Sequence, residues 1–263
     1  MNVYVVQFDV AWEDKTANFA RVRQLLDAAA PASGSLIVLP EMFSTGFSLT
    51  VAATRQGEPP EGELFLAALA RDFGSAVVGG VVSSSSGRPR NESVAFAPDG
   101  RLLARYAKIH PFGAADEGAH YAAGDEVVTF EWGGFTVAPF ICYDLRFPEV
   151  FRAAADCGAT LFTVIAQWPA RRVAHWQTLL PARAIENQAF VVGANRCGRD
   201  PQHAYSGRSC VVDPHGVVIA DAGEFEGVLS TIVEPSVVAR WREDFPALRD
   251  RRWNPAQTQP ARA

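Results

Sequence analysis

The stretch from Phe135 to Glu149 places the strongest constraint on the fold. Residues 135–141 form a nearly unbroken apolar run, which is typical of a strand covered on both faces of its sheet. Pro148 then falls where the first turn of a helix tolerates proline. Cys142 lies between the two elements, on a predicted sharp turn near a helix start whose partial positive charge favours a thiolate. A cysteine at the end of a buried strand is, however, more often inert packing.

Strands and helices alternate in both halves of the chain. An apolar strand over residues 3–9, an amphipathic helix over 16–30 and a buried strand over 35–39 predict a β-α-β unit with parallel strands. A helix over 61–73 and strands over 76–82, 93–98 and 101–105 follow. The second half repeats the alternation, with strands over 160–165 and 190–194 on either side of a helix over 173–187, before three meander strands over 209–213, 217–220 and 228–233.

No linker or low-complexity segment interrupts this pattern. We therefore expect one α/β domain over residues 1–263, with two sheets inside and helices outside. The tail over residues 253–263 has little apolar periodicity, which predicts a segment that is loose or docked on a partner subunit.

Composition excludes several classes of protein. The 263-residue chain is 48% hydrophobic and 20% charged, with a formal net charge of −5 and no lysine/arginine stripe, so we expect no nucleic-acid partner. The chain opens directly on a strand pattern and has no run near the roughly 18 apolar residues of a membrane helix. We therefore expect no membrane association and a cytoplasmic location.

The cysteines and histidines show no ligand spacing. Cys142, Cys157, Cys197 and Cys210 are too few and too irregular for a disulfide framework or a zinc site, which predicts free thiols in a reducing compartment. The five histidines are scattered, and there is no glycine-rich phosphate loop, so we expect no catalytic metal and no cofactor.

Three chemically active side chains follow predicted strands. Glu41 follows the strand over 35–39, Lys108 follows the strand over 101–105, and Cys142 ends the strand over 135–141. In open α/β sheets, the loops past the carboxyl ends of the strands converge on one crevice. A carboxylate, an ammonium and a thiol gathered there would suit acyl transfer, although a loop glutamate or lysine is more often simply solvated.

These positions lie in segments that resemble the three signature segments of the nitrilase, or carbon–nitrogen hydrolase, superfamily. The segments are Leu39-Pro-Glu-Met-Phe43, Tyr106-Ala-Lys-Ile-His110 and Ile141-Cys-Tyr-Asp-Leu-Arg-Phe-Pro-Glu149. The resemblance implies a four-layer α-β-β-α sandwich and a catalytic triad of Glu41, Lys108 and Cys142. It also implies a further catalytic-site acid, for which Glu117 is favoured and Asp116 and Asp125 are the alternatives.

We hypothesise that Glu41 takes the proton of Cys142, whose sulfur attacks an amide carbon to give a thioester. Lys108 and the backbone N–H of Tyr143 would stabilise the oxyanion. Among the branches, residues 116–121, 167–170, 175–177 and 182–188 look most like those of omega-amidases. This implies hydrolysis of 2-oxoglutaramate or 2-oxosuccinamate. The alternatives are another nitrilase-family amidase, an N-carbamoyl hydrolase, an acyltransferase and a non-catalytic binding member.

A substrate of this kind predicts a small pocket with aromatic walls and one cationic corner. The candidate walls lie beside the predicted catalytic segments and are Phe43, Phe47, Phe112, Tyr143 and Trp168. For Phe43 and Phe47, packing in the core is an equal alternative. Arg171 and Arg172 are both candidates for binding the substrate carboxylate, and Arg171 is the one taken as a site residue. For Arg146 we expect an ion pair with Glu149 or Glu186. The resemblance also implies a homodimer or higher homo-oligomer, for which residues 249–253 are a candidate contact.

Overall fold

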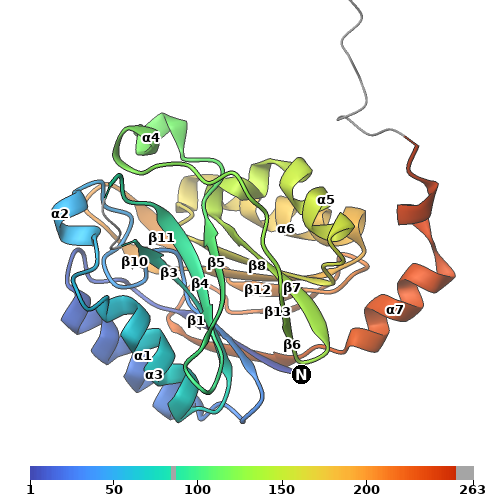
Figure 1. The fold of residues 1–263 in the computed structure, drawn as a ribbon, viewed down its shortest axis with the longest axis horizontal. Coiled ribbons are helices and arrows are strands. Elements are labelled where there is room, and N and C mark those ends of the chain that lie inside the picture. The colour runs from blue at the N-terminus through green and yellow to red at the C-terminus, as the bar shows by residue number, and fades with distance from the viewer. Residues whose placement is uncertain (84–86, 253–263) are drawn as a thin grey trace, which may run out of the picture.

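The computed structural model describes residues 1–83 and 87–252. The predicted tail over residues 253–263, and the Trp253 end of the candidate subunit contact, lie outside the described residues. Two six-stranded sheets pack face to face, with helices on the outer face of each (Figure 1). The predicted four-layer α-β-β-α sandwich is therefore confirmed.

The first sheet contains the five N-terminal strands and the C-terminal strand β14, in the order β14-β1-β2-β3-β4-β5. β1, β2 and β3 are parallel, whereas β3, β4 and β5 form antiparallel pairs. Its strands are β1 (Asn2–Gln7), β2 (Leu36–Val38), β3 (Ala76–Val82), β4 (Asn91–Phe96), β5 (Leu102–Ala107) and β14 (Gly227–Ile232). The β-α-β unit predicted at the N-terminus is present, and Lys108 directly follows β5.

The second sheet has the order β13-β12-β9-β8-β7-β6, with β7, β8 and β9 parallel. Its strands are β6 (Phe130–Trp132), β7 (Phe135–Ile141), β8 (Leu161–Ala166), β9 (Phe190–Asn195), β12 (Cys210–Val212) and β13 (Val218–Asp221). The apolar run over residues 135–141 forms β7, an interior strand that is almost entirely buried, as its sequence predicts. A small separate hairpin joins β10 (Cys197–Arg199) to β11 (Ala204–Ser206).

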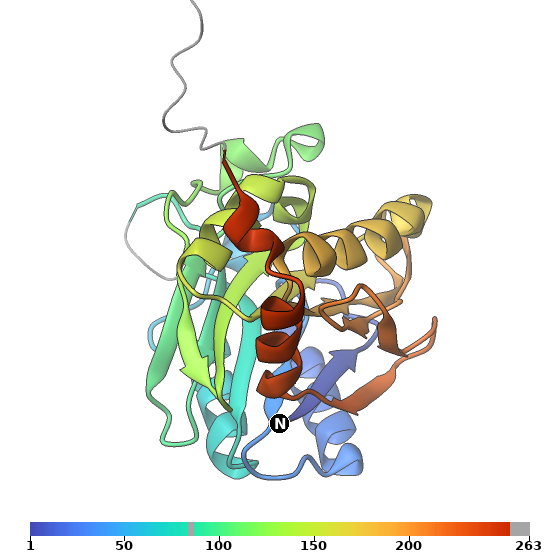
Figure 2. The same ribbon diagram turned by 90° about the vertical axis from the view of Figure 1, so that its right-hand side faces the viewer.

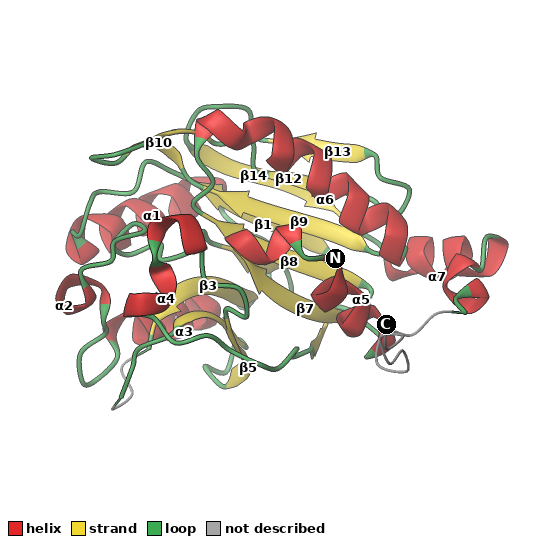
Figure 3. Cartoon of the chain, turned by 90° about the horizontal axis from the view of Figure 1, so that it is seen from above, coloured by secondary structure: helices red, strands yellow, loops and turns green. Residues whose placement is uncertain are grey.

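Helices cover both outer faces, as the view from above shows (Figure 3). On the first sheet, α1 (Lys15–Ala29) and α3 (Glu61–Asp72) bury Val22, Leu26 and Leu66. On the second sheet, α5 (Pro148–Asp156) and α6 (Val173–Asn187) bury Phe151 and Trp176 in the large core that also fills the space between the sheets. Two short helices, α2 (Val51–Thr54) and α4 (Glu117–His120), lie in loops beyond the strand ends.

The C-terminal part departs from the predicted meander. β12 and β13 pair as an antiparallel hairpin, but β14 leaves the second sheet and pairs antiparallel with β1 in the first. The chain then forms α7 (Pro235–Asp244), which the sequence pattern did not predict and which lies on the side of the molecule that faces the viewer in Figure 2. The Arg242 guanidinium of α7 donates to the carbonyl oxygens of Ala159 and Asn187, next to the ends of α5 and α6.

Candidate active site

Glu41 lies in a turn that follows β2, pressed against the neighbouring strand β3. A Cβ atom added at Gly80 of β3 would lie 2.5 Å from the backbone nitrogen of Met42 and 2.6 Å from Cα of Glu41. Glycine is therefore needed at position 80, because any side chain would displace this turn. Met42 itself adopts a left-handed conformation, with φ of 42°. The turn leaves the Glu41 side chain fully buried.

Lys108 joins two buried carboxylates. Its Nζ atom lies 2.9 Å from Oε1 of Glu41 and 2.9 Å from Oε2 of Glu117, and all three side chains are buried. Glu117 begins α4, and its carboxylate also accepts the backbone N–H of Phe112 at 2.6 Å. Asp116 and Asp125, the two alternatives, are exposed. The structure thus brings Glu117, and neither aspartate, to the lysine.

Two polar residues that the sequence reasoning missed complete this cluster. Asn91 Nδ2 donates to Glu41 at 2.7 Å and to Glu117 at 2.9 Å, so it links the two carboxylates. The backbone N–H of Gln167 donates to Oε2 of Glu41 at 2.9 Å, and its side-chain amide donates to the Glu41 carbonyl oxygen at 2.7 Å. Both residues lie at strand ends, Asn91 at the start of β4 and Gln167 just after β8, and that position is the signal that could have identified them.

Cys142 lies on a sharp turn, but not at the start of a long helix. It has φ of 46° and opens the 3₁₀ turn Cys142–Arg146, and α5 begins only at Pro148. The prediction that the start of a helix lies at Cys142 and favours its thiolate is therefore wrong. A left-handed conformation at a non-glycine residue costs about 1–3 kcal/mol and requires support from its surroundings.

The charges around the sulfur favour the protonated thiol in the resting site. Burial and the negative charge of Glu41 raise the pKa of Cys142 well above its ordinary value of 9.0, while Lys108 acts in the opposite direction. Burial opposes the Lys108 ammonium, but Glu117 and Glu41 outweigh that effect and hold the pKa of Lys108 well above its ordinary value. The cluster therefore combines a cation that stays charged with a thiol that needs a base.

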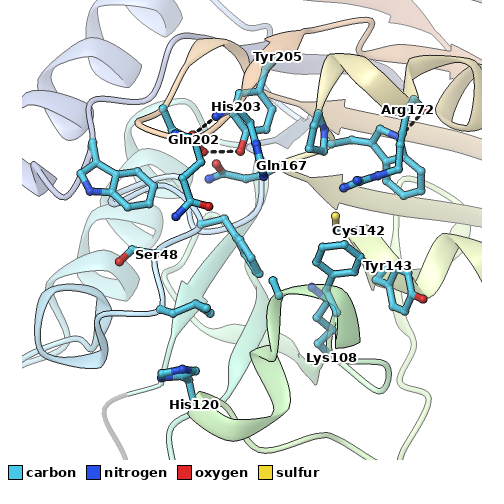
Figure 4. A pocket seen from close by; sticks show the side chains of 18 of the residues that line it. Ser48, Lys108, His120, Cys142, Tyr143, Gln167, Arg172, Gln202, His203 and Tyr205 are labelled. Atoms are coloured by element: carbon cyan, nitrogen blue, oxygen red, sulfur yellow. Dashed lines mark hydrogen bonds between the residues drawn. The ribbon is translucent and has the colours of Figure 1, made fainter.

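Lys108 and Cys142 open on one cavity of about 360 Å³ (Figure 4). Of the predicted walls, Phe47, Phe112, Tyr143 and Trp168 line it. Phe43 does not, because it is fully buried among the rings of Phe19 and Phe65 under the outer helices. The prediction that Phe43 contacts substrate is therefore wrong.

The cationic side of the cavity is formed by Arg146 and Arg172. Of the two arginines predicted to bind the substrate carboxylate, Arg172 lines the cavity, whereas Arg171 is exposed and does not. Arg146 does not form its expected ion pair either, because Glu186 pairs with Arg183. Instead, the Arg146 guanidinium lies 4.7 Å from the centre of the Trp168 ring and bonds to His175.

Another wall of the cavity comes from a segment that the sequence did not mark. The hairpin formed by β10 and β11 contributes Gln202, His203 and Tyr205, seen at the top of Figure 4. Asp200 holds the tip of this hairpin, since its carboxylate accepts the Tyr205 hydroxyl at 2.5 Å and the His203 backbone N–H at 2.6 Å. Only the polar, glycine-containing composition of residues 198–203 indicates a loop there.

Residues 1–83 and 87–252 contain neither a metal-binding cluster nor a helix that could span a membrane. Within these ranges, no three histidine, cysteine, aspartate or glutamate side chains are arranged to hold a metal ion. None of the helices described above is both long and apolar enough to cross a membrane.

Known proteins are similar to this chain in both sequence and fold. The carbon–nitrogen hydrolase family model matches residues 2–243. Omega-amidase YafV of Yersinia enterocolitica is 37% identical over 254 residues, which cover 95% of this chain and 96% of that one. The 2-oxoglutaramate amidase of Bacillus subtilis is 31% identical over 247 residues, covering 93% and 95%.

Among solved structures, XC1258 of Xanthomonas campestris, a CN-hydrolase superfamily protein, superposes with a TM-score of 0.91 at 33% identity. The superposition covers 97% of this chain and 98% of that one. Sequence, fold and relatives agree, and the chain is thus an amidase of the carbon–nitrogen hydrolase family, in the omega-amidase-like branch of the nitrilase superfamily.

Proposed function

We propose that this amidase hydrolyses the terminal amide of a small 2-oxo dicarboxylic acid, 2-oxoglutaramate or 2-oxosuccinamate, to the dicarboxylate and ammonia. One observation carries the proposal: Cys142 and Lys108 share a small cavity with two guanidinium groups, Arg146 and Arg172, which have no carboxylate partner among the described residues. Free guanidinium groups suit a substrate that brings its own carboxylate. The similarity to a 2-oxoglutaramate amidase supports the same substrate class.

The hydrolysis begins with transfer of the Cys142 proton to Glu41. The sulfur then forms a bond to the amide carbon, and the oxyanion is held by Lys108 and the backbone N–H of Tyr143, each worth about 3–4 kcal/mol when well placed. Glu41 returns its proton to the departing ammonia, which leaves a thioester. Glu41 next activates a water molecule, and its attack releases the acid and the thiol.

The hydrogen bonds of the cluster support these roles. Glu41 is fixed by Lys108, Asn91 and the backbone of Gln167, so its carboxylate has a defined direction. Glu117 contacts Lys108 through both oxygens, at 2.9 and 3.2 Å, which supports a role in holding and neutralising the ammonium. The raised pKa of Cys142 explains why a base is required.

The test is steady-state ammonia release from 2-oxoglutaramate and 2-oxosuccinamate, alongside turnover of a simple nitrile and an N-carbamoyl amino acid. We expect the highest kcat/KM for a 2-oxo ω-amide, loss of activity in Cys142→Ala, and wild-type activity in the control Cys157→Ala. Wild-type turnover by Cys142→Ala would refute the thioester route. Faster turnover of the nitrile or the carbamoyl substrate would refute the substrate class, and hydroxamate formation with hydroxylamine exceeding hydrolysis would favour an acyltransferase.

We also propose that the chain is a single domain, forms a homo-oligomer and works in the cytoplasm. The family match over residues 2–243 supports the first point. Exposed apolar side chains outside the cavity, such as Val217, Phe225 and Ile232, support a subunit contact, which light scattering would test. The four cysteines, all free, are compatible with a reducing compartment.

A further inference from the structure

One buried carboxylate, that of Asp144, contacts the two segments that carry Cys142 and Lys108. Its Oδ2 atom accepts the Tyr106 hydroxyl at 2.8 Å and the backbone N–H of Ile141 at 3.1 Å. Its Oδ1 atom accepts the backbone N–H of His110 at 2.9 Å and lies 2.9 Å from Nδ1 of the same residue. With the proton of His110 on Nδ1, these four donors fill the acceptor sites of the carboxylate.

The positions of these donors along the chain are informative. Tyr106 and His110 lie two residues before and two residues after Lys108, so both sides of the lysine are attached to the same carboxylate. Ile141 directly precedes Cys142, and Asp144 belongs to the turn that Cys142 opens. A single side chain therefore fixes the nucleophile turn to the backbone on either side of Lys108.

The turn needs such support because its conformation is unfavourable. Cys142 has φ of 46°, a region that residues other than glycine rarely adopt unless the surrounding structure imposes it. The bond from Ile141 N–H to Asp144 closes the chain around Cys142 from one side. Packing of the Tyr106 ring against Phe140, with centroids 5.6 Å apart, supports the same arrangement.

We propose that Asp144 is a positioning residue that sets the placement of the Cys142 sulfur relative to the Lys108 ammonium. Asp144 is fully buried and does not line the cavity, so it touches neither substrate nor reacting atoms. This inference rests on the roles proposed above for Cys142 and Lys108. It adds that the distance between them is determined by a carboxylate outside the catalytic cluster.

The test is the variant Asp144→Asn, which keeps the shape of the side chain. The NH₂ group of the asparagine would face donors that one oxygen of the Asp144 carboxylate accepts in the wild type. The segments that carry Cys142 and Lys108 would therefore separate locally. We expect kcat to fall about 100-fold, the scale of a displacement of about 1 Å in a catalytic group. The KM should stay within roughly threefold, because the Asp144 side chain forms no hydrogen bond with Arg172 or with the wall residues Phe47, Phe112 and Trp168.

Two further variants separate positioning from general stability. Tyr106→Phe removes one of the four donors and should lower kcat by roughly 3- to 10-fold with little change in KM. In the Asp144→Asn background the same change should have no further effect on kcat, because the shared bond is already lost. Val238→Ala truncates a buried side chain on α7, far from the cavity, and should lower the thermal midpoint without lowering kcat.

The inference is wrong if folded Asp144→Asn keeps kcat within threefold of wild type, or if Val238→Ala loses kcat to the same extent. Should Asp144→Asn fail to fold, wild-type kcat in Tyr106→Phe would overturn the inference instead. Activity in Cys142→Ala would instead refute the proposed thioester route. An inactive Cys142→Ala with an unaffected Asp144→Asn would refute the positioning role alone.

Discussion

Replacing Glu117 by glutamine removes one of the two carboxylates that neutralise the buried ammonium of Lys108. The Glu117 side chain accepts two contacts from Lys108, one from Asn91 and one from the backbone N–H of Phe112. Glutamine keeps one acceptor oxygen, and its amide group would point a donor at another donor. Glu41 would then be the only carboxylate bonded to the ammonium, and a carboxylate held more tightly by a cation takes a proton less readily.

The size of the effect follows from the bonds that are lost. A hydrogen bond to a charged group contributes about 1.5–3 kcal/mol. Glutamine loses at least one such bond to Lys108 or Phe112 and weakens the base, so we take about 2–3 kcal/mol as the loss of transition-state stabilisation. This loss corresponds to a decrease in kcat of roughly 30- to 160-fold.

The assay is ammonia release from 2-oxoglutaramate by Glu117→Gln, with circular dichroism and thermal unfolding to confirm the fold. The chain supplies matched controls in Asp116→Asn and Asp125→Asn, because both aspartates are nearby and exposed. We expect both controls to stay within about twofold of wild type. Near-wild-type kcat for Glu117→Gln, or a larger loss in either control, would refute this account of the cluster.

Three other changes test separate parts of the site. Gly80→Ala should lower kcat at least about 10-fold, because the new Cβ would lie 2.5 Å from a backbone nitrogen in the turn that carries Glu41. Gly79→Ala is the control in the same assay, because the atoms nearest to its new Cβ are the terminal methyl groups of the Leu66 side chain. Arg172→Met should raise KM roughly 10- to 100-fold and Arg171→Met should leave it unchanged, as substrate titration would show. Because the pKa of Cys142 is raised above 9.0, its alkylation by iodoacetamide in the resting enzyme, followed by mass spectrometry, should keep accelerating as pH rises past 9; a plateau near neutral pH would contradict this.

The strand-end positions of the catalytic segments could be predicted because they follow from local pattern. The strands predicted over residues 35–39, 101–105 and 135–141 correspond to β2, β5 and β7, and the sheet geometry brings their carboxyl ends together. The helix predicted over residues 173–187 has those bounds in the structure, since its periodicity is clear along its length. The family resemblance added the catalytic roles proposed for Glu41, Lys108 and Cys142.

The choice between neighbouring side chains could not be predicted from the sequence. Arg171 and Arg172 both lie in the three-residue turn Ala170–Arg172, where one step along the chain rotates a side chain by about a third of a turn. Phe43 and Phe47 lie on opposite sides of a turn that begins with the positive φ of Met42. A pattern of residue types carries no information about such rotations.

Long-range strand pairing was also beyond the sequence pattern. β13 and β14 are consecutive strands separated by a short loop, which favours a hairpin. Instead, β14 pairs with the edge of β1, and Asn2 and Gln7 of β1 lie opposite Ile232 and Gly227 of β14. The contacts of Arg196 could not be predicted from the sequence pattern either. Its fully buried side chain joins Asp9 to the hairpin formed by β10 and β11.

The charges of the cluster explain why the nucleophile is not permanently ionised. Glu41 and Glu117 carry two negative charges against one positive charge on Lys108, so a thiolate at Cys142 would be a third anion beside a single cation. In the proposed mechanism, the proton therefore stays on the sulfur until Glu41 accepts it, and this transfer leaves the total charge of the two groups unchanged. In that mechanism, attack becomes favourable when the amide oxygen takes over the negative charge of the sulfur next to Lys108, so the reactive thiolate exists only while substrate is present.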